Sequence, residues 1–247
     1  MSALAYYLED QGIPAVAISL IRLHSEKIAN PRSLWVPFEL GRPFGPPGNA
    51  AFQTRVIATA LGLLTAAPGP VLLADFPDDD PTTVELPGWQ PPFDLPPIDT
   101  DLTDQTALAR AVTQELRAVA PSYDRFVAAS RRTTVGLSGL GLADAALYIA
   151  ASLADPPPPS PDAAVAAVQM LRWAVDDVKA YYLEAMAAGP GIPASRQMQA
   201  WFWDRSVAAR LIIALRARLL ASAEPRSQAV GRMNLVPGAQ VARLGLG

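Results

Sequence analysis

Residues 35–53, WVPFELGRPFGPPGNAAFQ, join a short apolar segment to the start of a helical pattern through a loop rich in proline and glycine. Proline fixes the backbone angle φ and glycine allows positive φ, so this composition predicts a loop of defined shape. Asn49 is a favourable N-cap, and its helix would present free N–H groups and a positive dipole end close to Arg42. That arrangement suits a small carboxylate or phosphate.

Apolar runs on both sides of this stretch predict a small parallel sheet. Strands and helices are expected to alternate, with strands over residues 15–21, 33–38 and 71–74 and helices over residues 3–11, 22–30 and 50–65. This alternation is typical of a parallel α/β unit. In open sheets of this kind, ligands bind beyond the carboxyl ends of the strands.

A proline-rich, acidic stretch over residues 77–100 predicts a connector. Beyond it the pattern is helical, with helices expected over residues 104–119, 122–132, 142–153, 161–188 and 194–223. Pro121 is expected to separate the first two of these helices. The sequence therefore predicts an α/β N-terminal unit over residues 1–76 and a mostly helical, bundle-like region over residues 101–247.

The composition excludes several classes of function. The formal net charge of −3 disfavours a nucleic-acid partner. No apolar run is long enough to predict a membrane span, and the first residues lack a signal-peptide pattern, so cytoplasm is the expected compartment. The sequence has no cysteine and only one histidine, which excludes thiolate chemistry and Cys-ligated metals. No metal site is expected.

Two segments of the N-terminal region, LEDQGIPAVAISL (8–20) and WVPFELGRPFGPPGNAAFQTRVI (35–57), carry a resemblance to a known family. They are similar to the C-terminal segment of the selenoprotein B family of glycine, sarcosine, betaine and D-proline reductases. In that family a helix ending in G-I-P leads to a strand, and a loop ending in G-x-P-x-(N/D) precedes a helix with an early Gln. The matching positions are residues 12–14, residues 45–49 and Gln53. The resemblance covers residues 1–76.

The family carries its selenocysteine and a nearby cysteine in a half that precedes this segment, and neither residue occurs in this sequence. The resemblance therefore implies a cysteine-free relative, an enzyme or a possible oxidoreductase subunit. It would act on a small amine or amino-acid-like substrate without thiol or selenol chemistry. The alternative is a non-catalytic partner or scaffold subunit, in contact with another protein or a second copy, that keeps the family fold as a docking surface. An exposed apolar patch on the helical half, with no enclosed pocket near the loop, would favour this alternative.

The cofactor is unknown from the sequence. A nucleotide-dependent redox protein would carry a G-x-G-x-x-G fingerprint after a strand, and no such motif is present. Residues 136–141 are rich in glycine but follow no clear strand.

The candidate site residues of the α/β unit lie at the expected carboxyl ends of its strands. The candidate catalytic residues are His24, Glu39 and Asp75, and the candidate substrate-binding residues are Arg22, Arg42, Asn49 and Gln53. His24 would move a proton near neutral pH, and Arg42 would bind a substrate carboxylate through its guanidinium fork. Structural alternatives stay open. His24 can be a surface residue, Glu39 and Arg42 can pair with each other, and Asp75 can accept from backbone donors.

A second candidate site in the helical region consists of Asp177, Lys179 and Tyr181. Lys179 would serve as a Schiff-base amine if its surroundings lowered its pKa. The alternative is structural: the aromatic side chains pack the bundle, while Asp177 or Asp204 pairs with Arg210 or Lys179.

Overall fold

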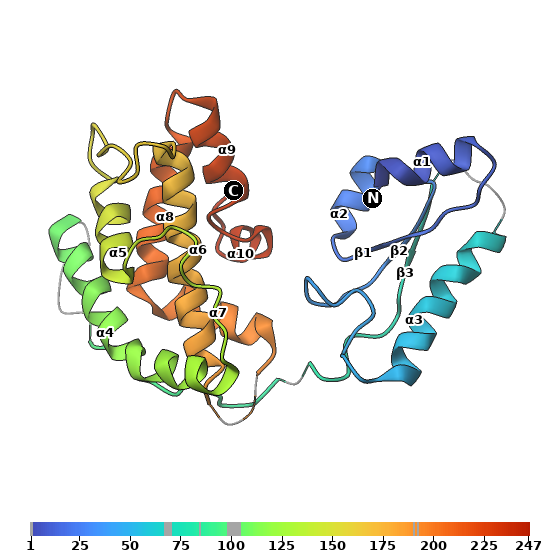
Figure 1. Ribbon diagram of the computed structural model, residues 1–247, viewed down its shortest axis with the longest axis horizontal. Coiled ribbons are helices and arrows are strands. Elements are labelled where there is room, and N and C mark those ends of the chain that lie inside the picture. Colours follow the sequence, from blue (N-terminus) through green and yellow to red (C-terminus); the bar gives the residue numbers. More distant parts are fainter. Residues whose placement is uncertain (1, 67–70, 84, 98–104, 190, 192) are drawn as a thin grey trace. The chain divides into compact units, whose positions relative to one another are not determined.

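The computed structural model describes residues 2–66, 71–83, 85–97, 105–189, 191 and 193–247. The chain forms two compact units, Met1–Val84 and Glu85–Gly247 (Figure 1). The first is named the α/β unit and the second the helical unit. The division between them falls within the proline-rich stretch of residues 77–100.

The α/β unit contains a three-stranded sheet, as the sequence predicts. Its elements, in chain order, are α1 (Ser2–Asp10), β1 (Ala17–Ser19), α2 (Arg22–Ile28), β2 (Arg32–Trp35), α3 (Ala50–Gly62), the 3₁₀ turn η1 (Leu63–Thr65) and β3 (Leu72–Asp75). The strands are parallel in the order β1-β2-β3. The predicted parallel sheet is confirmed, although β1 and β2 are shorter than the apolar runs that indicate them.

One face of the sheet packs against α3. The register aligns Ile18 with Leu34 and Leu34 with Ala74, so these side chains share a face. They meet the buried side of α3, which contributes Phe52 and Val56. This contact forms the hydrophobic core of the α/β unit.

Three phenylalanine rings complete this core. Phe38 follows β2, Phe52 belongs to α3, and Phe76 follows β3; their ring centroids lie 5.4 to 5.8 Å apart. Gly45 lies directly against the Phe52 ring, because a Cβ atom at this position would be 2.5 Å from Cε1 of that ring. Gly45 also has a φ of +84°. The loop therefore needs glycine here both for its backbone conformation and for its packing.

Helix α1 is attached to β2 by a carboxylate. Glu9 accepts hydrogen bonds from the guanidinium of the buried Arg32 and from the Ala15 backbone N–H, the latter at 2.8 Å. The bond from Arg32, followed by that from Ala15, lowers the pKa of Glu9. Because its partners bind the charged form, Glu9 stays ionised.

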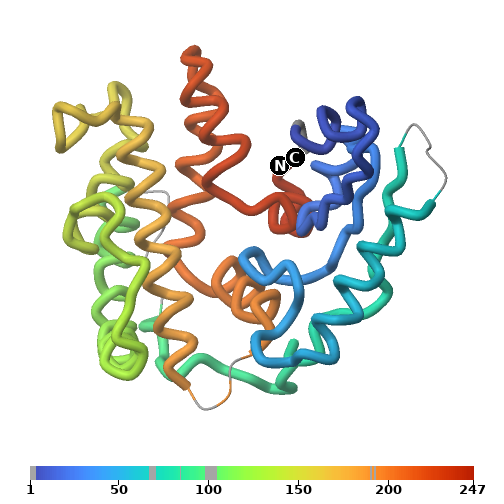
Figure 2. The backbone as a smooth tube through the Cα atoms, turned by 45° about the vertical axis from the view of Figure 1, so that its right-hand side comes forward, coloured from blue at the N-terminus to red at the C-terminus, as the bar shows by residue number. Residues whose placement is uncertain are grey.

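The helical unit is a bundle, as the sequence predicts. Its helices are α4 (Gln105–Ser130), α5 (Leu142–Ala151), α6 (Ala167–Met186), α7 (Ser195–Arg205), α8 (Val207–Leu220), α9 (Pro225–Met233) and α10 (Gly238–Arg243). Helices α4, α5 and α6 pack against one another, and α8 packs against both α4 and α5 (Figures 1 and 2). No described helix combines the length and the apolar composition that crossing a membrane requires.

Residues 85–97 form neither helix nor strand and are anchored to the bundle. The backbone of Leu86 donates to and accepts from the side-chain amide of Gln197, at 3.0 and 2.7 Å. The Pro92 carbonyl accepts from Ser122 Oγ at 2.9 Å, and the Phe93 ring meets Trp201 edge to face. This part of the proline-rich stretch thus belongs to the helical unit.

The predicted helix break at Pro121 is wrong, because α4 continues through it. Proline removes the N–H that the Arg117 carbonyl would accept from. Leu116 and Val119 before the proline and Ser122 after it are all buried. Packing on both sides therefore outweighs the loss of one helical hydrogen bond.

The predicted helix over residues 194–223 is also wrong, because two helices meet at Ser206. Ser206 has an extended conformation, and its Oγ accepts from the N–H of Ala209 at 3.0 Å. It is the N-cap of α8, which ends the continuous apolar pattern. The predicted helix over residues 161–188 begins later, at Ala167, and α9 and α10 were not predicted.

Replacing Gly45 tests whether packing, and not only backbone conformation, selects glycine in the loop. Gly48→Ala, with a φ of +79° and no atom within 4 Å of the added Cβ, should cost about 1 kcal/mol for the left-handed conformation alone. Gly45→Ala should cost about 3 kcal/mol, because overlap with Phe52 adds to that penalty. Hydrogen exchange of the Val36 amide, which donates to Ser19 O, reports the free energy of opening. Equal losses in the two variants would contradict the packing role.

Candidate functional site

The carboxyl edge of the sheet is the expected place for a ligand in the α/β unit. The register aligns Ser19, Trp35 and Asp75 in one row where the strands end. Helix α2 begins at Arg22, directly after β1. The edge therefore brings together residues from the first and third strands, as the sequence predicts for a parallel sheet.

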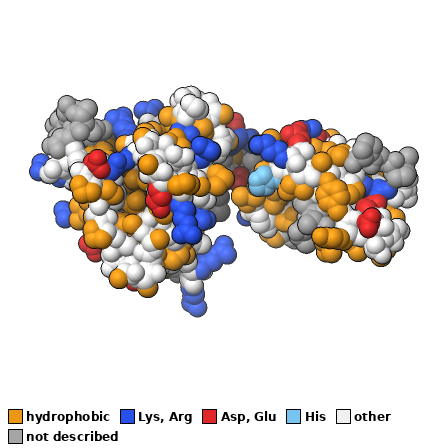
Figure 3. Space-filling model, turned by 90° about the horizontal axis from the view of Figure 1, so that it is seen from above, with side chains coloured by type: hydrophobic (Ala, Val, Ile, Leu, Met, Phe, Trp, Pro, Cys, Tyr) orange, Lys and Arg blue, Asp and Glu red, His pale blue; other side chains and the backbone are white. Residues whose placement is uncertain are grey.

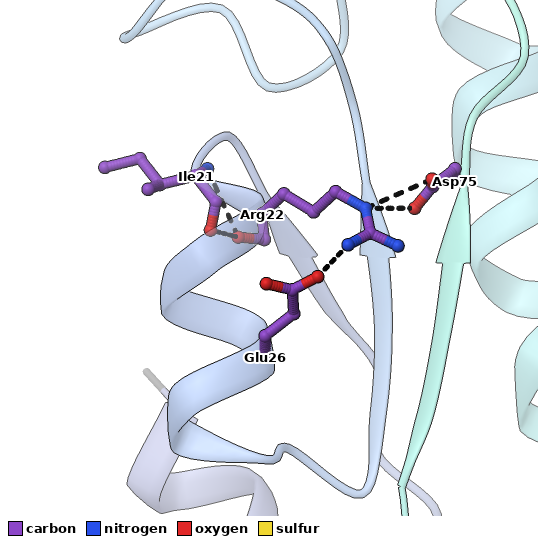
Figure 4. Close-up of polar contacts among 5 residues, drawn as sticks. Ile21, Arg22, Glu26 and Asp75 are labelled. Carbon is purple, nitrogen blue, oxygen red and sulfur yellow. Dashed lines mark hydrogen bonds and ion pairs between the residues drawn. The ribbon is translucent and has the colours of Figure 1, made fainter. Parts of the chain in front are cut away.

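Arg22 and Asp75 lie close together at this edge. Arg22 Nε donates to both carboxylate oxygens of Asp75, at 3.0 and 3.1 Å, and Nη1 pairs with Glu26 (Figure 4). The Arg22 and Asp75 side chains are 42% and 46% exposed, so water screens the pair. The predicted substrate-binding arginine thus binds the predicted catalytic carboxylate. A ligand that binds Arg22 Nε would have to displace this contact.

Asn49 and Gln53 fix the loop before α3. Asn49 Oδ1 accepts from the N–H of Phe52 at 3.1 Å, which is the predicted N-cap. Gln53 Nε2 donates to the Pro46 carbonyl at 2.9 Å. Both side chains, predicted to bind substrate, have contacts that hold the loop and the helix start.

His24, Glu39 and Arg42 are exposed, and none of their side chains has a hydrogen bond or ion pair within the described part of the chain. The predicted alternative of a Glu39–Arg42 side-chain pair is wrong. The two residues are joined through their backbones, with Arg42 N–H donating to Glu39 O at 3.0 Å.

Three cavities, of about 770, 390 and 330 Å³, lie in the helical unit. All of their lining residues come from positions 90–227, so none of the candidates in the α/β unit lines them. The structure brings Arg22 and Asp75 together but gives His24, Glu39 and Arg42 no place in these cavities.

Asp177 in α6 anchors a loop. Its carboxylate accepts from the N–H groups of Gly136, Leu137 and Ser138 at 2.8 to 2.9 Å, and from the Ser138 hydroxyl. Asp177 is buried, and these bonds compensate its charge. The predicted pairing of Asp177 with Arg210 or Lys179 is therefore wrong. Three N–H groups of the glycine-rich loop already bind a carboxylate of the chain itself.

Glu184, two turns further along α6, holds the preceding part of the same loop. It accepts from the hydroxyl of Thr133 and from both the N–H and the hydroxyl of Thr134, each at 2.7 Å. The two carboxylates of one helix thus bind residues 133–138, which connect α4 to α5.

Lys179 and Tyr181 have separate structural contacts. Lys179 Nζ lies 2.9 Å from Asp176 Oδ1 and donates to the Asn234 and Leu235 carbonyls. The Tyr181 hydroxyl donates to Leu116 O at 2.9 Å. Burial, with smaller contributions from Asp124 and Tyr123, raises the pKa of Tyr181 to about 12. The polar atoms of Asp177, Lys179 and Tyr181 therefore serve three different contacts.

Asp204 also has a partner that the sequence analysis did not identify. Its carboxylate pairs with both terminal nitrogens of Arg243 in α10, at 2.9 and 3.0 Å. The predicted pairing with Arg210 or Lys179 is wrong, because α10 supplies the cation.

A buried carboxyl group that the sequence analysis missed lies at the start of α8. Glu115 in α4 accepts from the N–H groups of Val207 and Ala208 and from the Tyr182 hydroxyl, at 2.8 to 3.2 Å. It is 1% exposed. Burial raises the pKa of Glu115, and the hydrogen bonds from Val207, Tyr182 and Ala208 oppose that shift. The positive end of the α8 dipole also favours a negatively charged side chain at this position.

The sequence does contain a signal for Glu115. It occupies the same helical face as Val112, Leu116 and Val119, all of which are buried. An acidic residue at core spacing requires a partner, which here is the start of another helix.

Within the described ranges, no group of three or more His, Asp or Glu side chains is placed to hold a metal ion. Comparison with protein-family models, curated proteins and solved structures finds no match to this chain.

Removing the Asp177 carboxylate should release the loop between α4 and α5. Asp177→Ala leaves three N–H groups without an acceptor and should lower the free energy of unfolding by about 3 kcal/mol. The matched control is Asp176→Ala, which breaks a partly exposed ion pair and should cost about 1 kcal/mol or less. Urea unfolding gives both values, and amide exchange at residues 136–138 locates the change. Unchanged exchange there would contradict the anchoring role.

Glu115 predicts a specific pH dependence of stability. Its pKa is higher in the folded chain, so its stabilising contribution is complete below the unfolded pKa of about 4.3 and is lost as pH rises through the folded pKa. Glu115→Gln removes this titration. Wild type should therefore gain stability relative to Glu115→Gln when the pH falls from about 7.5 to about 4.5.

Urea unfolding at both pH values measures this gain. Glu85→Gln, at an exposed ion-paired position, controls for the removal of a carboxylate in general. The assignment would be contradicted if the difference in the free energy of unfolding between wild type and Glu115→Gln stayed constant with pH. It would also be contradicted if wild type became less stable relative to Glu115→Gln at the lower pH.

Proposed function

We propose that this chain is a non-catalytic interaction subunit whose α/β unit docks through the outer face of α3, and that a second copy of the chain occupies this face. The proposal follows the scaffold alternative of the sequence analysis. It rests on one observation above all: besides its buried apolar face, α3 has a second, exposed face that is mostly apolar and carries no charge.

The inner face of α3 belongs to the core through Phe52, Val56 and Ala60. A second set of residues follows the spacing i, i+4, i+7, i+8, i+11, which places them together on another face. We name this set the outer stripe; it consists of Ala50, Thr54, Ile57, Ala58 and Leu61. All five residues are exposed, and Ile57 and Leu61 are 41% and 53% exposed.

The outer stripe has no charged residue. A surface helix of a globular protein normally has polar and charged residues on the face opposite the core, whereas a helix that is apolar all round is usually buried. Covering Ile57 and Leu61 would remove apolar surface from water at about 25 cal/mol per Å². The composition of α3 therefore fits a helix that lies between two protein layers.

The rest of the α/β unit is also unusually apolar at its surface. Twelve of the fifteen large hydrophobic side chains that are exposed in the described residues belong to this unit, although it is the shorter of the two. Figure 3 shows hydrophobic side chains, in orange, on the visible face of this unit as well as on the helical unit. Extended exposed apolar surface is typical of protein interaction sites. The sequence analysis expected such a patch on the helical half, so the location differs from that expectation.

The charge of α3 favours a second copy over a charged partner. In a two-fold contact the same patch meets itself, so a charged stripe would oppose like charges, whereas a neutral stripe does not. Arg55, the charged residue of α3, pairs with Asp78, and its guanidinium lies 5.2 Å from the centre of the Phe52 ring. The small residues Ala50 and Ala58 allow two helices to approach closely.

The state of the sheet edge supports a non-catalytic role. Arg22 and Asp75 bind each other, while Asn49 and Gln53 hold the loop. An enzyme subunit that acts on a small amine or amino-acid-like substrate, the activity implied by the family resemblance, is the second proposal. Its support is the exposure of His24 and Arg42 without a described side-chain partner. Cytoplasm is the proposed compartment for either role.

Sedimentation velocity over a concentration series tests self-docking. Wild type should form a dimer at about 100 µM, and Ile57→Glu should be monomeric, because it places a charge opposite its own symmetry mate. The matched control is Leu147→Glu, which alters a comparably exposed residue of the helical unit and should stay dimeric. Circular dichroism checks that each variant is folded. A monomeric wild type, or a dimeric Ile57→Glu, would overturn the proposal.

A further inference from the structure

We propose that the cavity of about 770 Å³ in the helical unit binds a small organic anion with an apolar body. This site is independent of the outer stripe of α3, because all of its described lining residues belong to the helical unit. Its volume falls in the range of about 300 to 1,000 Å³ typical of small-molecule sites.

The walls of the cavity are largely apolar. One wall is α4, where Ala107, Ala111 and Ala118 follow helical spacing along one face. Another wall consists of residues 95–97, Leu-Pro-Pro, and Val207 at the start of α8 also lines the cavity. Alanine leaves room beside the helix, and proline offers a rigid apolar surface without a backbone donor. The body of a ligand would therefore meet hydrocarbon on two sides.

Two arginines supply the positive charge. Arg110 and Arg117 both line the cavity, and neither has a hydrogen bond or ion pair with a described residue. They are seven residues apart, about two helical turns or about 10 Å along the axis of α4. Both are exposed, so they can reorient toward a ligand without leaving a buried partner uncompensated.

Neither acidic residue among the described lining residues pairs with these arginines. Glu115 is committed to the start of α8 and to Tyr182, since its oxygens accept from those groups. Asp94 is exposed and is the other carboxylate among the described lining residues. Among the described lining residues, two guanidinium groups and one carboxylate group are thus left without a partner. This balance favours an anionic ligand over a cationic one.

A guanidinium fork binds either a carboxylate or a phosphate through paired hydrogen bonds. The head group of the ligand can therefore be of either kind, and its apolar body is common to both. Octanoate and octyl phosphate are suitable probes, because they share one chain and differ in the head group. The neutral compound 1-octanol has the same alkyl chain without a charge, so it shows how much of the binding the chain alone provides.

Isothermal titration calorimetry of the full chain with these three compounds tests the site, and amide shifts at Ala107, Ala111 and Ala118 locate it. The test variant is Arg110→Gln/Arg117→Gln, which keeps polar side chains but removes both charges. Arg232→Gln is the matched control, since Arg232 is exposed, has no described partner and lies outside the cavity.

At least one of the two anions should bind wild type with shifts at the three alanines. Its affinity should fall by about tenfold or more in the double variant and stay unchanged in Arg232→Gln. The stronger of the two anions identifies the head group. No binding by either anion, equal binding by the double variant, or shifts confined to other residues would overturn the proposal. The oligomeric state is a separate readout, so this result does not depend on docking through α3.

Discussion

The contact between Gly45 and the Phe52 ring joins the loop before α3 to the core of the α/β unit. It brings the proline-glycine loop onto the first turn of α3 and turns Phe52 toward Phe38 and Phe76. Because a helix has a fixed periodicity, orienting Phe52 inward also orients the outer stripe away from the sheet. Asn49, which lies between Gly45 and Phe52 in the chain, caps α3 by accepting from the N–H of Phe52. Packing in the core is thus coupled to the hydrogen bond that the Asn49 side chain makes and to the exposure of the outer stripe.

In the helical unit, buried carboxylates accept hydrogen bonds from backbone N–H groups of a loop and of a helix start. A loop and a helix start both present donors without backbone acceptors, and a buried donor without an acceptor is costly. Asp177 supplies the acceptor for the loop between α4 and α5, and Glu115 supplies it for the start of α8. Acidic residues that resemble catalytic candidates in the sequence are therefore structural anchors. Their contacts join segments that are 39 to 93 residues apart in the chain.

The sequence predicts the parallel sheet and the helical bundle, because apolar periodicity and proline-glycine punctuation are local signals. The Asn49 cap was predictable for the same reason. Pro121 was misread because packing around it is a tertiary property that local helix rules do not include. Ser206 was missed because its capping role interrupts a continuous apolar pattern. The partners of Asp177 and Asp204 were predicted wrongly because their hydrogen bonds depend on the three-dimensional arrangement of distant segments.

In the dimer that we propose, the outer stripe of α3 contacts the same stripe of a second copy. Isotope-filtered NMR on an equal mixture of ¹³C-labelled and unlabelled chains tests this directly, because it detects only contacts between copies. We expect intermolecular NOEs from the methyl groups of Ile57 and Leu61. A dimer whose intermolecular NOEs arise only from other residues, or a mixture without any such NOEs, would contradict it.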